Sequence, residues 1–505
     1  MRFSRFWCLI WLLILFGCKS SQVATDAAAS LIDRLVVLQV NDVYEIAPIQ
    51  GGAAGGLARV ATLKQQLDTT ADKTYLVMAG DFLSPSVIGT VKLDGERIKG
   101  AQMIDVMNAA GFDFVVFGNH EFDLEEGELQ ARIDASKFDW VAGNVQRKTG
   151  SGIVAFTQLG QPLPTSYVMT VPRAEGTPLQ VGVISVCLPA NQKDYVYYQD
   201  VLESAATQWR ELMPRTDFIV AATHQAIEQD RELARHLPGL KLIMGGHEHE
   251  NHFEVVEGVP IAKADANART AYVHRFTFNR LTGEVDLRSE LKPIGPEISE
   301  DSAVAARVAD WEQKAYAAFE AQGLALDSPV VTLAEPLDGL ETHIRTQPTN
   351  LGEAIAQAMY AAWDSVDCAL ANSGMVRIDD YLQGEITQFD LVRALPFGGQ
   401  VLRVKMTGKL LQQVLQTGQA NRGSGGYLQT YGVSERDGQW YVDGQPLQTD
   451  RVYSVAMGDF LLTGLEQNMD FLTRENPQVL RVDAPAPESL ARDIRLALAE
   501  YLKNR

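Results

Sequence analysis

The sequence predicts an α/β protein of two or three domains. At 505 residues the chain is too long for one ordinary domain. From residue 35 onward, short apolar runs of strand length alternate with helical patterns, which favours parallel strands joined by helices. A second series of strand and helix patterns begins near residue 329, after a segment without Gly or Pro at 302–322. That segment predicts a connecting helix, with a helix inside either domain as the alternative.

The composition is that of a folded, acidic protein. Hydrophobic residues make up 46% of the chain and charged residues 21%, which is ample for packed cores. The net charge of −20, without any Lys/Arg-rich run, argues against a nucleic-acid partner. Acidity does not exclude an anionic substrate, because a bound metal can reverse the local potential.

The amino terminus predicts export. Arg2 and Arg5 precede an apolar run at 6–16, which is shorter than the about 20 residues that span a bilayer. Leu15-Phe16-Gly17-Cys18 resembles the bacterial lipobox, although Phe16 is bulkier than its usual residue, and Cys18 would carry the lipid. Lys19 would favour the outer membrane of a Gram-negative host. Without cleavage, the same segment would be an uncleaved anchor.

The remaining cysteines predict two buried thiols. Cys187 and Cys368 both lie in apolar runs, and they fall in different predicted domains. A disulfide between them is the less favoured alternative.

The predicted elements alternate regularly along the first half of the chain. Helices are expected at 57–67 and 101–110, and β-type runs within 255–278 predict a second sheet that completes the domain. Strands are expected at 35–40, 75–79, 113–117, 140–144, 181–186, 217–222 and 240–244. In the second half, the pattern predicts strands at 329–333 and 366–370, a helix at 351–363 and β-rich sequence from 401 to 455.

The hexapeptide Gly118-Asn119-His120-Glu121-Phe122-Asp123 lies between a predicted buried strand and an acidic helix start. Chemistry in α/β sheets is usually found at such strand ends. The oxygen of Asn119 can ligate a hard metal, His120 can shuttle a proton and Asp123 can orient His120. The alternative is an ordinary turn in which Asn119 caps a helix and His120 is exposed.

Five polar stops follow predicted strands. They are Asp42, Asp81, Asn119-His120, His224 and His247-Glu248-His249. We expect all five at the same edge of one parallel-rich sheet. A histidine after one strand is unremarkable, but five such stops in order predict a metal centre.

This order resembles the calcineurin-like metallophosphoesterases, and within them the bacterial periplasmic 5′-nucleotidase/UDP-sugar hydrolase group. The resemblance covers nearly all of residues 31–505. It implies a four-layer β-sandwich-type metallophosphoesterase domain joined by a helix to a smaller α/β substrate-binding domain. The implied boundaries are a lipoprotein signal peptide at 1–18, a tether at 19–30, the metallophosphoesterase domain at 31–300, a linker helix at 301–324 and the C-terminal substrate-binding domain at 325–505.

The resemblance implies two divalent metal ions bridged by Asp81. The implied ligands are Asp42, Asp81 and His249 for one metal, and Asp81, Asn119, His224 and His247 for the other. Such mixed ligands suit Mn, Zn, Co or Fe better than Ca. Two such ions can activate a shared water and clamp the phosphoryl oxygens. His120 would protonate the leaving group or stabilise the phosphoryl oxygens, and Asp123 would fix its tautomer.

One metal position departs from the family pattern. The family usually reads Asp-x-His in its first motif, whereas this chain reads Asp42-Val43-Tyr44. Tyr44 would be either a phenolate ligand or a neutral phenol that hydrogen-bonds to the site. Either possibility predicts weaker or altered binding of the first metal.

The second half carries matches to the family's substrate-binding residues. The resemblance implies that Arg345 and Arg377 contact phosphate, as guanidinium groups can fork onto its oxygens. Asn372 begins the segment that resembles the family's Asn-Gly-Gly-Gly-Ile-Arg stretch. Phe397 and Phe460 would stack on a base. Glu466 replaces the aspartate that contacts ribose in the family, and Leu465 replaces a glycine, so base and sugar preference could differ.

Taken together, the sequence predicts an exported, lipid-anchored, monomeric phosphoesterase of the cell envelope. It would hydrolyse nucleoside 5′-monophosphates by attack of a metal-bound hydroxide. One alternative is a related esterase that acts on 2′,3′-cyclic nucleotides, UDP-sugars or a non-nucleotide ester. Another is a surface lipoprotein that binds nucleotide or metal without turnover.

Overall fold

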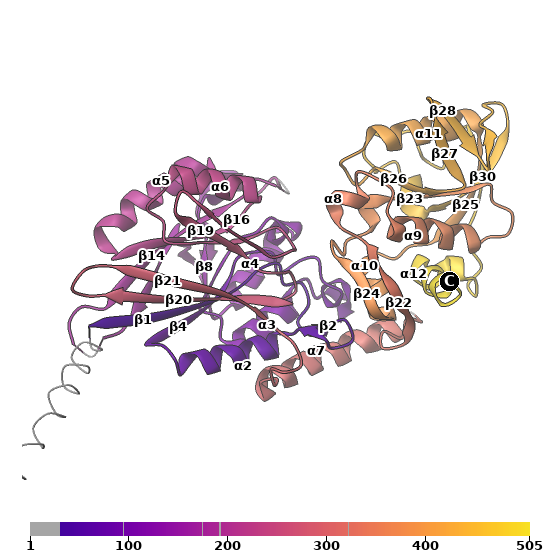
Figure 1. Cartoon of the computed structure of the whole chain (residues 1–505). Helices are drawn as coiled ribbons and strands as arrows, with labels where there is room; N and C mark the ends of the chain where they lie inside the picture. Colours follow the sequence, from indigo (N-terminus) through magenta and orange to yellow (C-terminus); the bar gives the residue numbers. More distant parts are fainter. Residues whose placement is uncertain (1–30, 94, 174, 191–192, 322) are drawn as a thin grey trace, which may run out of the picture.

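The computed structural model describes residues 31–93, 95–173, 175–190, 193–321 and 323–505 (Figure 1). These residues form two α/β domains. The first contains two six-stranded mixed sheets, and the second contains a five-stranded sheet with smaller sheets around it. The predicted signal peptide, the lipidation site Cys18 and the tether lie outside the described residues. Among the described helices, none combines the length and the apolarity that crossing a membrane requires.

The first sheet contains the strands that lead to Asp42, Asp81 and Asn119. Its order is β21 (Val285–Pro293), β20 (Thr270–Asn279), β1 (Ile32–Val40), β4 (Lys73–Met78), β7 (Phe114–Val116) and β8 (Asp139–Val141). Strands β1, β4, β7 and β8 are parallel, and β20 is antiparallel to β1. Helices α2 (Leu57–Asp68), α3 (Ala101–Ala110) and α4 (Glu126–Ala135) share a hydrophobic core with this sheet.

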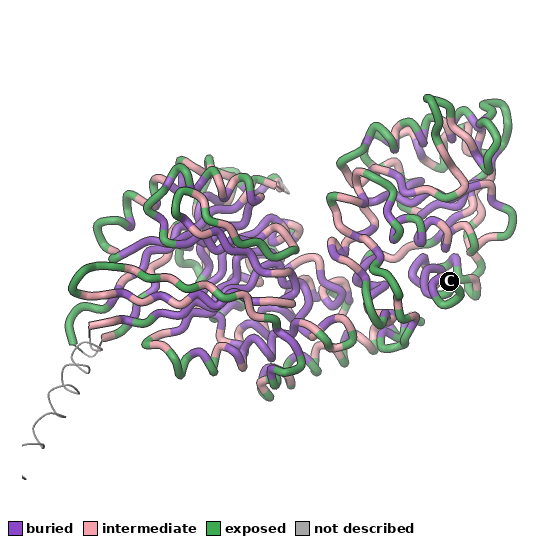
Figure 2. The backbone as a smooth tube through the Cα atoms, viewed as in Figure 1, coloured by how far each residue is buried: buried purple, intermediate pink, exposed green. Residues whose placement is uncertain are grey.

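The second sheet leads to the remaining histidines. Its order is β13 (Ser166–Val171), β14 (Leu179–Cys187), β16 (Phe218–His224), β17 (Ile243–Gly246), β19 (Val259–Lys263) and β18 (His252–Val256). Helices α5 (Val201–Leu212) and α6 (Ile227–His236) pack on its outer face. Side chains of both sheets form one core between them, including Val37, Val77, Val183 and Val220. The predicted four layers are therefore confirmed, and the buried strands lie at the centre of the domain (Figure 2).

The expectation that all five polar stops share one sheet is wrong. Asp42, Asp81 and the 118–123 segment follow strands of the first sheet, whereas His224 and His247 follow strands of the second. The two sheets pack face to face, and the carboxyl ends of their parallel strands reach the same edge of the sandwich. The pattern of strand ends is visible in the sequence, but the partition between the sheets depends on long-range pairing.

The helix α7 (Ser302–Glu320) lies where the connecting helix is predicted (Figure 1). It packs along α2 and α3, and the indole of Trp311 donates to Asp105 at 3.0 Å. Val304 and Val308 belong to the core of the first domain. The connection is therefore anchored to the first domain over most of its length.

The second domain is built around a five-stranded sheet. Its order is β26 (Leu428–Tyr431), β23 (Cys368–Asn372), β30 (Val452–Gly458), β25 (Val401–Thr407) and β31 (Val479–Asp483). Strands β22 (Pro329–Asp338) and β24 (Tyr381–Thr387) form a ribbon beside the first domain. The helices of the second domain include α9 (Asn350–Ala361), α10 (Gln388–Ala394), α11 (Gly408–Ala420) and α12 (Ile494–Lys503). Among the described residues, Cys187 and Cys368 are buried free thiols, as the sequence predicts.

We predict that Asp33, at the start of β1, stabilises the first domain through a buried ion-pair cluster. Its carboxylate accepts from Nε of Arg173 at 2.9 Å and of Arg280 at 3.0 Å. Asp33→Asn is expected to lower the free energy of unfolding by about 2–3 kcal/mol at pH 7, measured by urea unfolding. The exposed Asp286→Asn on β21 is the control, and equal losses in both variants would contradict this role.

The same cluster makes the stability of the first domain depend on pH. Burial opposes ionisation of Asp33, but the two arginines outweigh it and hold its pKa below the ordinary 3.8. The stabilisation is therefore complete above the unfolded-state pKa and is lost as the pH falls through the lower folded-state pKa. The difference in the free energy of unfolding between the native protein and Asp33→Asn should therefore become smaller as the pH falls from the unfolded-state pKa of Asp33 to its folded-state pKa.

Candidate metal centre

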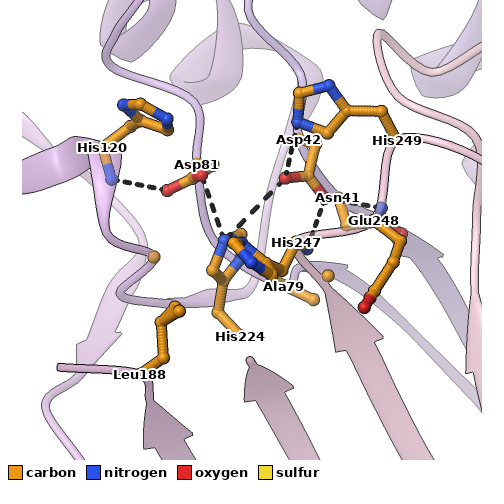
Figure 3. A network of polar contacts seen from close by, with 12 residues as sticks. Asn41, Asp42, Ala79, Asp81, His120, Leu188, His224, His247, Glu248 and His249 are labelled. Carbon is orange, nitrogen blue, oxygen red and sulfur yellow. Dashed lines mark hydrogen bonds and ion pairs between the residues drawn. The ribbon is translucent and has the colours of Figure 1, made fainter. Parts of the chain in front are cut away.

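Two buried carboxylates form the centre of the site. Asp42 follows β1 and Asp81 follows β4, and their exposed fractions are 0% and 1%. Nε2 of His224, at the end of β16, lies 3.0 Å from Oδ2 of Asp81 and 3.8 Å from Oδ1 of Asp42 (Figure 3). One ligand atom from each of these three residues lies within 4.8 Å of the others. Three separate strands thus deliver two anionic ligands and one imidazole ligand to one buried point.

Hydrogen bonds fix how His224 faces this point. Its Nδ1 lies 2.8 Å from the carbonyl oxygen of Ala79, which can only accept, so Nδ1 carries a proton. The other nitrogen, Nε2, therefore faces the carboxylates. Burial opposes protonation of the ring, yet Asp81 and Asp42 raise the pKa of His224 to about 9. The centre thus has a strongly negative potential that attracts cations.

The loops that carry the ligands adopt unusual backbone conformations. Asp42, Asp81 and His247 have φ values of 53°, 57° and 88°, a region that residues other than glycine rarely occupy. Each lies one to three residues after the end of a strand. Such strain at three neighbouring polar residues is typical of a functional site.

Glu121 holds two of these loops together, and the sequence analysis did not assign it a role. Its carboxylate accepts backbone N–H groups from Asp81 at 2.9 Å, Phe82 at 2.8 Å, Leu83 at 3.1 Å and Gly118 at 2.7 Å. Burial and the charge of Asp81 raise the pKa of Glu121 to about 7, against the effect of these donors. Its place inside the hexapeptide, three residues after Gly118, was the only signal in the sequence.

The remaining histidines come from the loop after β17. The backbone N–H of His247 donates to Oδ2 of Asp42 at 3.0 Å, and Nε2 of His249 lies 3.5 Å from Oδ1 of Asp42. Burial and the charge of His224 lower the pKa of His247. Asn119, which precedes His120, is buried beside Asp81. All six ligand positions implied by the family pattern therefore gather around Asp42 and Asp81.

A buried lysine supports this histidine loop from behind. Nζ of Lys263 donates to the carbonyl oxygens of Gln225 at 2.6 Å and Gly246 at 2.9 Å. It also pairs with Asp230 at 2.8 Å and with Glu248. This lysine links the segment after His224 to the segment before His247, and no motif in the sequence distinguished it.

His120 and Asp123 form a second polar pair at the edge of the carboxylates. Nδ1 of His120 lies 2.8 Å from Oδ2 of Asp123, which also accepts from the hydroxyl of Ser84 at 2.9 Å. The backbone N–H of His120 donates to Oδ1 of Asp81 at 2.7 Å. Burial opposes protonation, but Asp81 and Asp123 raise the pKa of His120 to about 9. An imidazolium with a fixed orientation can donate a proton from Nε2.

Tyr44 occupies the side of the site where the family pattern has an imidazole. Its hydroxyl oxygen lies 3.0 Å from Nε2 of His249, 3.4 Å from Oδ2 of Asp81 and 3.5 Å from Oδ1 of Asp42. Burial, and then the two carboxylates, raise the pKa of Tyr44 well above its ordinary value. Without a bound cation, the neutral phenol of Tyr44 is therefore favoured over the phenolate.

These residues fit divalent metal ions. Two carboxylates share a buried site with imidazoles that take up protons to offset the negative charge, and divalent cations would replace those protons. The donor set of carboxylate, amide and imidazole suits transition metals. The backbone packs tightly against the site, because a Cβ on Gly118 would lie 2.1 Å from Oδ1 of Asp81.

The second domain places its predicted substrate residues in two groups. Arg377 lines a small pocket between the domains, together with Tyr44 and Ser86 of the first domain. Burial lowers the pKa of Arg345 and the charge of Arg377 adds to this effect, while Nη1 of Arg345 pairs with Oε1 of Glu341 at 2.5 Å. In the other group, the amide of Asn372 donates to Oε2 of Glu466 at 2.7 Å.

The two predicted base-stacking rings are both exposed. Phe397 and Phe460 have exposed fractions of 64% and 45%, and the guanidinium of Arg377 lies 5.7 Å from the centre of the Phe397 ring. Among the described residues, the two rings make no aromatic contact with each other. Exposed aromatic rings beside an arginine are a suitable platform for a planar, anionic ligand.

Comparisons with known proteins match both domains. Residues 35–251 match the calcineurin-like phosphoesterase family, and residues 329–474 match the 5′-nucleotidase C-terminal domain. The chain is 26% identical over 469 residues to the 5′-nucleotidase of Homo sapiens, covering 81% of this chain and 78% of that protein. It is 24% identical over 464 residues to the trifunctional nucleotide phosphoesterase YfkN of Bacillus subtilis, covering 81% of this chain and 31% of YfkN.

Two solved structures share the two-domain fold. A 5′-nucleotidase precursor from Thermus thermophilus has a TM-score of 0.66 and 22% identity, covering 93% of this chain and 96% of that one. A sulfate thiohydrolase, SoxB, from the same species has a TM-score of 0.61 and 16% identity, covering 93% of this chain and 94% of that one. Since these two proteins are named for different activities, the fold alone does not set the substrate.

We predict that Gly118→Ala disrupts the metal centre without unfolding the protein. The added methyl group would displace the Asp81 carboxylate, and displacement of about 1 Å can cost about a hundredfold in rate. Metal content measured by mass spectrometry and phosphatase activity should both fall sharply. Gly127→Ala in α4 is the matched control, because a Cβ there meets no atom within 4 Å. Normal metal content in Gly118→Ala would contradict the placement of Asp81.

Proposed function

The chain belongs to the 5′-nucleotidase family, and from this premise we propose that it hydrolyses nucleoside 5′-monophosphates to nucleoside and phosphate. It is a metal-dependent phosphoric ester hydrolase of this family, with a calcineurin-like phosphoesterase domain and a 5′-nucleotidase C-terminal domain. The observation that carries the proposal is the His120–Asp123 pair beside Asp81.

The metal ligands divide as the family pattern implies. Asp42, Asp81 and His249 would hold one ion, and Asp81, Asn119, His224 and His247 would hold the other. When bound, the ions would polarise the phosphoryl oxygens and acidify a water molecule. Mn, Zn, Co or Fe ions would suit this set of ligands.

His120 supplies the proton that the leaving group needs. During hydrolysis a water oxygen bonds to phosphorus, and the bond from phosphorus to the nucleoside O5′ breaks. The Nε2 proton of the His120 imidazolium passes to that oxygen. Asp123 keeps the ring oriented by accepting a hydrogen bond from Nδ1, which lies 2.8 Å from its Oδ2. A protein that only bound nucleotide would not need this pair.

The second domain supplies the substrate contacts. Arg345 and Arg377 would bind the phosphate through forked hydrogen bonds. Phe397 and Phe460 would enclose the base, and the paired Asn372 and Glu466 would contact the sugar.

One observation favours a second candidate substrate class. Leu465, where the family has a glycine, is 76% exposed next to Glu466, and Glu466 is already held by Asn372. An altered sugar contact is compatible with 2′,3′-cyclic nucleotides, UDP-sugars or a non-nucleotide ester.

We further infer that the protein is exported and held in the cell envelope as a monomer. Residues 1–18 have the charged start and short apolar run of a signal peptide, and Cys18 would carry the lipid. The periplasmic side of the outer membrane is the proposed location.

We predict that His120→Ala abolishes phosphate release in metal-loaded protein. Loss of a general acid typically costs about a hundredfold to ten-thousandfold in rate. Phosphate release would be measured from AMP, UMP, UDP-glucose, a 2′,3′-cyclic nucleotide and p-nitrophenyl phosphate, with Mn, Zn, Co, Mg or EDTA. His236→Ala, an exposed histidine on α6, is the control. Turnover of the cyclic nucleotide alone would favour the second candidate, and nucleotide binding without turnover would exclude an enzyme.

We also predict that Phe397→Ala discriminates between nucleotide and generic substrates. Loss of one stacking contact of about 1–3 kcal/mol should raise KM for AMP about fivefold or more. The KM for p-nitrophenyl phosphate, which has no nucleobase, should change little. Phe253→Ala on β18, also an exposed phenylalanine, is the control. A parallel rise for both substrates would contradict a base-stacking role.

A further inference from the structure

The second domain contacts a metal-ligand histidine of the first. Nδ1 of His249 lies 2.9 Å from the backbone carbonyl oxygen of Asp379 and 3.1 Å from Oδ2 of the same residue. Asp379 belongs to the loop between β23 and β24, about 130 residues later in the chain. Because only 10% of the His249 side chain is exposed, this contact forms inside the interface between the domains.

This contact decides which nitrogen of His249 faces the metal centre. A carbonyl oxygen only accepts hydrogen bonds, so Nδ1 carries the proton that points to Asp379. Nε2 is then directed at the centre, 3.5 Å from Oδ1 of Asp42. Histidines that bind metals commonly donate their other N–H to a carboxylate or carbonyl, and this partner sets the orientation of the ring.

The loop that carries Asp379 is itself rigidly held. Oδ1 of Asp379 accepts a hydrogen bond from the backbone N–H of Glu341 at 2.6 Å, and the φ of Asp379 is 39°. The next residue, Asp380, is buried and receives Nη1 of Arg269 at 3.0 Å and Nη2 of Arg393 at 2.9 Å. These contacts from three separate segments fix the 379–380 pair in one arrangement.

Arg269 connects this pair to the backbone of His249. Its Nη2 donates to the carbonyl oxygen of His249 at 2.9 Å, while its Nη1 binds Asp380. The ring of His249 is therefore tied to the 379–380 pair directly, and its backbone is tied to the same pair through Arg269. The ring of Tyr44 contacts His249 from the other side, with ring centres 5.4 Å apart.

We propose that Asp379 is a positioning residue for the metal site, supplied by the second domain, and that it holds His249 in the orientation that binds metal. The inference rests on the proposed function only in that His249 is a metal ligand. It matters more in this chain because Tyr44 replaces an imidazole, so the first metal depends on fewer strong ligands. Loading of that metal is thereby coupled to the contact between the domains.

The test measures Mn²⁺ binding by residues 19–505, which include both domains. Equilibrium dialysis followed by mass spectrometry would give bound Mn²⁺ per chain against free Mn²⁺ for the native protein, Asp379→Ala and Asp379→Asn. Asp379→Ala keeps the backbone carbonyl, but it removes the Oδ2 contact to His249 and the Oδ1 contact to Glu341 that holds the loop in place. We therefore expect it to raise the midpoint of the weaker site about tenfold, as for other partners of metal-bound histidines. Asp379→Asn, which keeps an acceptor and tolerates positive φ, should show a smaller shift in the same direction.

Asp443→Ala is the matched control. Asp443 is an exposed aspartate of the second domain with a similar φ of 47°, so it reproduces the backbone effect without the contact to His249. Saturating Mn²⁺ should restore turnover in Asp379→Ala, which a general structural defect would not allow. The proposal would be overturned if both Asp379 variants bound Mn²⁺ with the same midpoint as the native protein. It would also be overturned if Asp443→Ala shifted the midpoint by the same amount. If the native protein does not hydrolyse nucleotides, the proposed function fails, but the loading comparison still decides the role of Asp379.

Discussion

The structure depends on the close approach of two buried carboxylates, Asp42 and Asp81. Two such charges so near each other repel, and burial removes the water that would screen them. The surroundings offset this cost with His224 and His249, with backbone N–H groups and with the hydroxyl of Tyr44. The same negative potential makes the site suitable for divalent cations, so the constraint on folding and the basis of function are one feature.

Much of the fold and the site could be predicted from the sequence, because strand ends have a local signature. Apolar runs that stop at Asp42, Asp81 or His224 show where polar side chains leave a sheet. Two sheets were expected, but the assignment of β14, β16 and β17 to the second sheet could not be predicted, since these strands resemble those of the first sheet. Glu121 and Lys263 were also missed, because one carboxylate or one lysine acquires its role only from the backbone groups that folding brings to it.

In the function that we propose, the two domains contribute different chemistry to one site. The first domain would hold the charge and the proton donor, and the second would bring arginines and exposed aromatic rings. Asp379 adds a direct contact between the second domain and a ligand of the first. A site completed across a domain interface can respond to movement between the domains.

The most direct test is anomalous diffraction from crystals of the protein soaked in Mn²⁺. Two ions acting on one phosphate lie about 3.5–4 Å apart. Our account predicts two peaks at about this spacing that share the Asp81 carboxylate, with Asp42 and His249 at one and Asn119, His224 and His247 at the other. The absence of any peak beside Asp42 and Asp81, at concentrations that saturate activity, would contradict it.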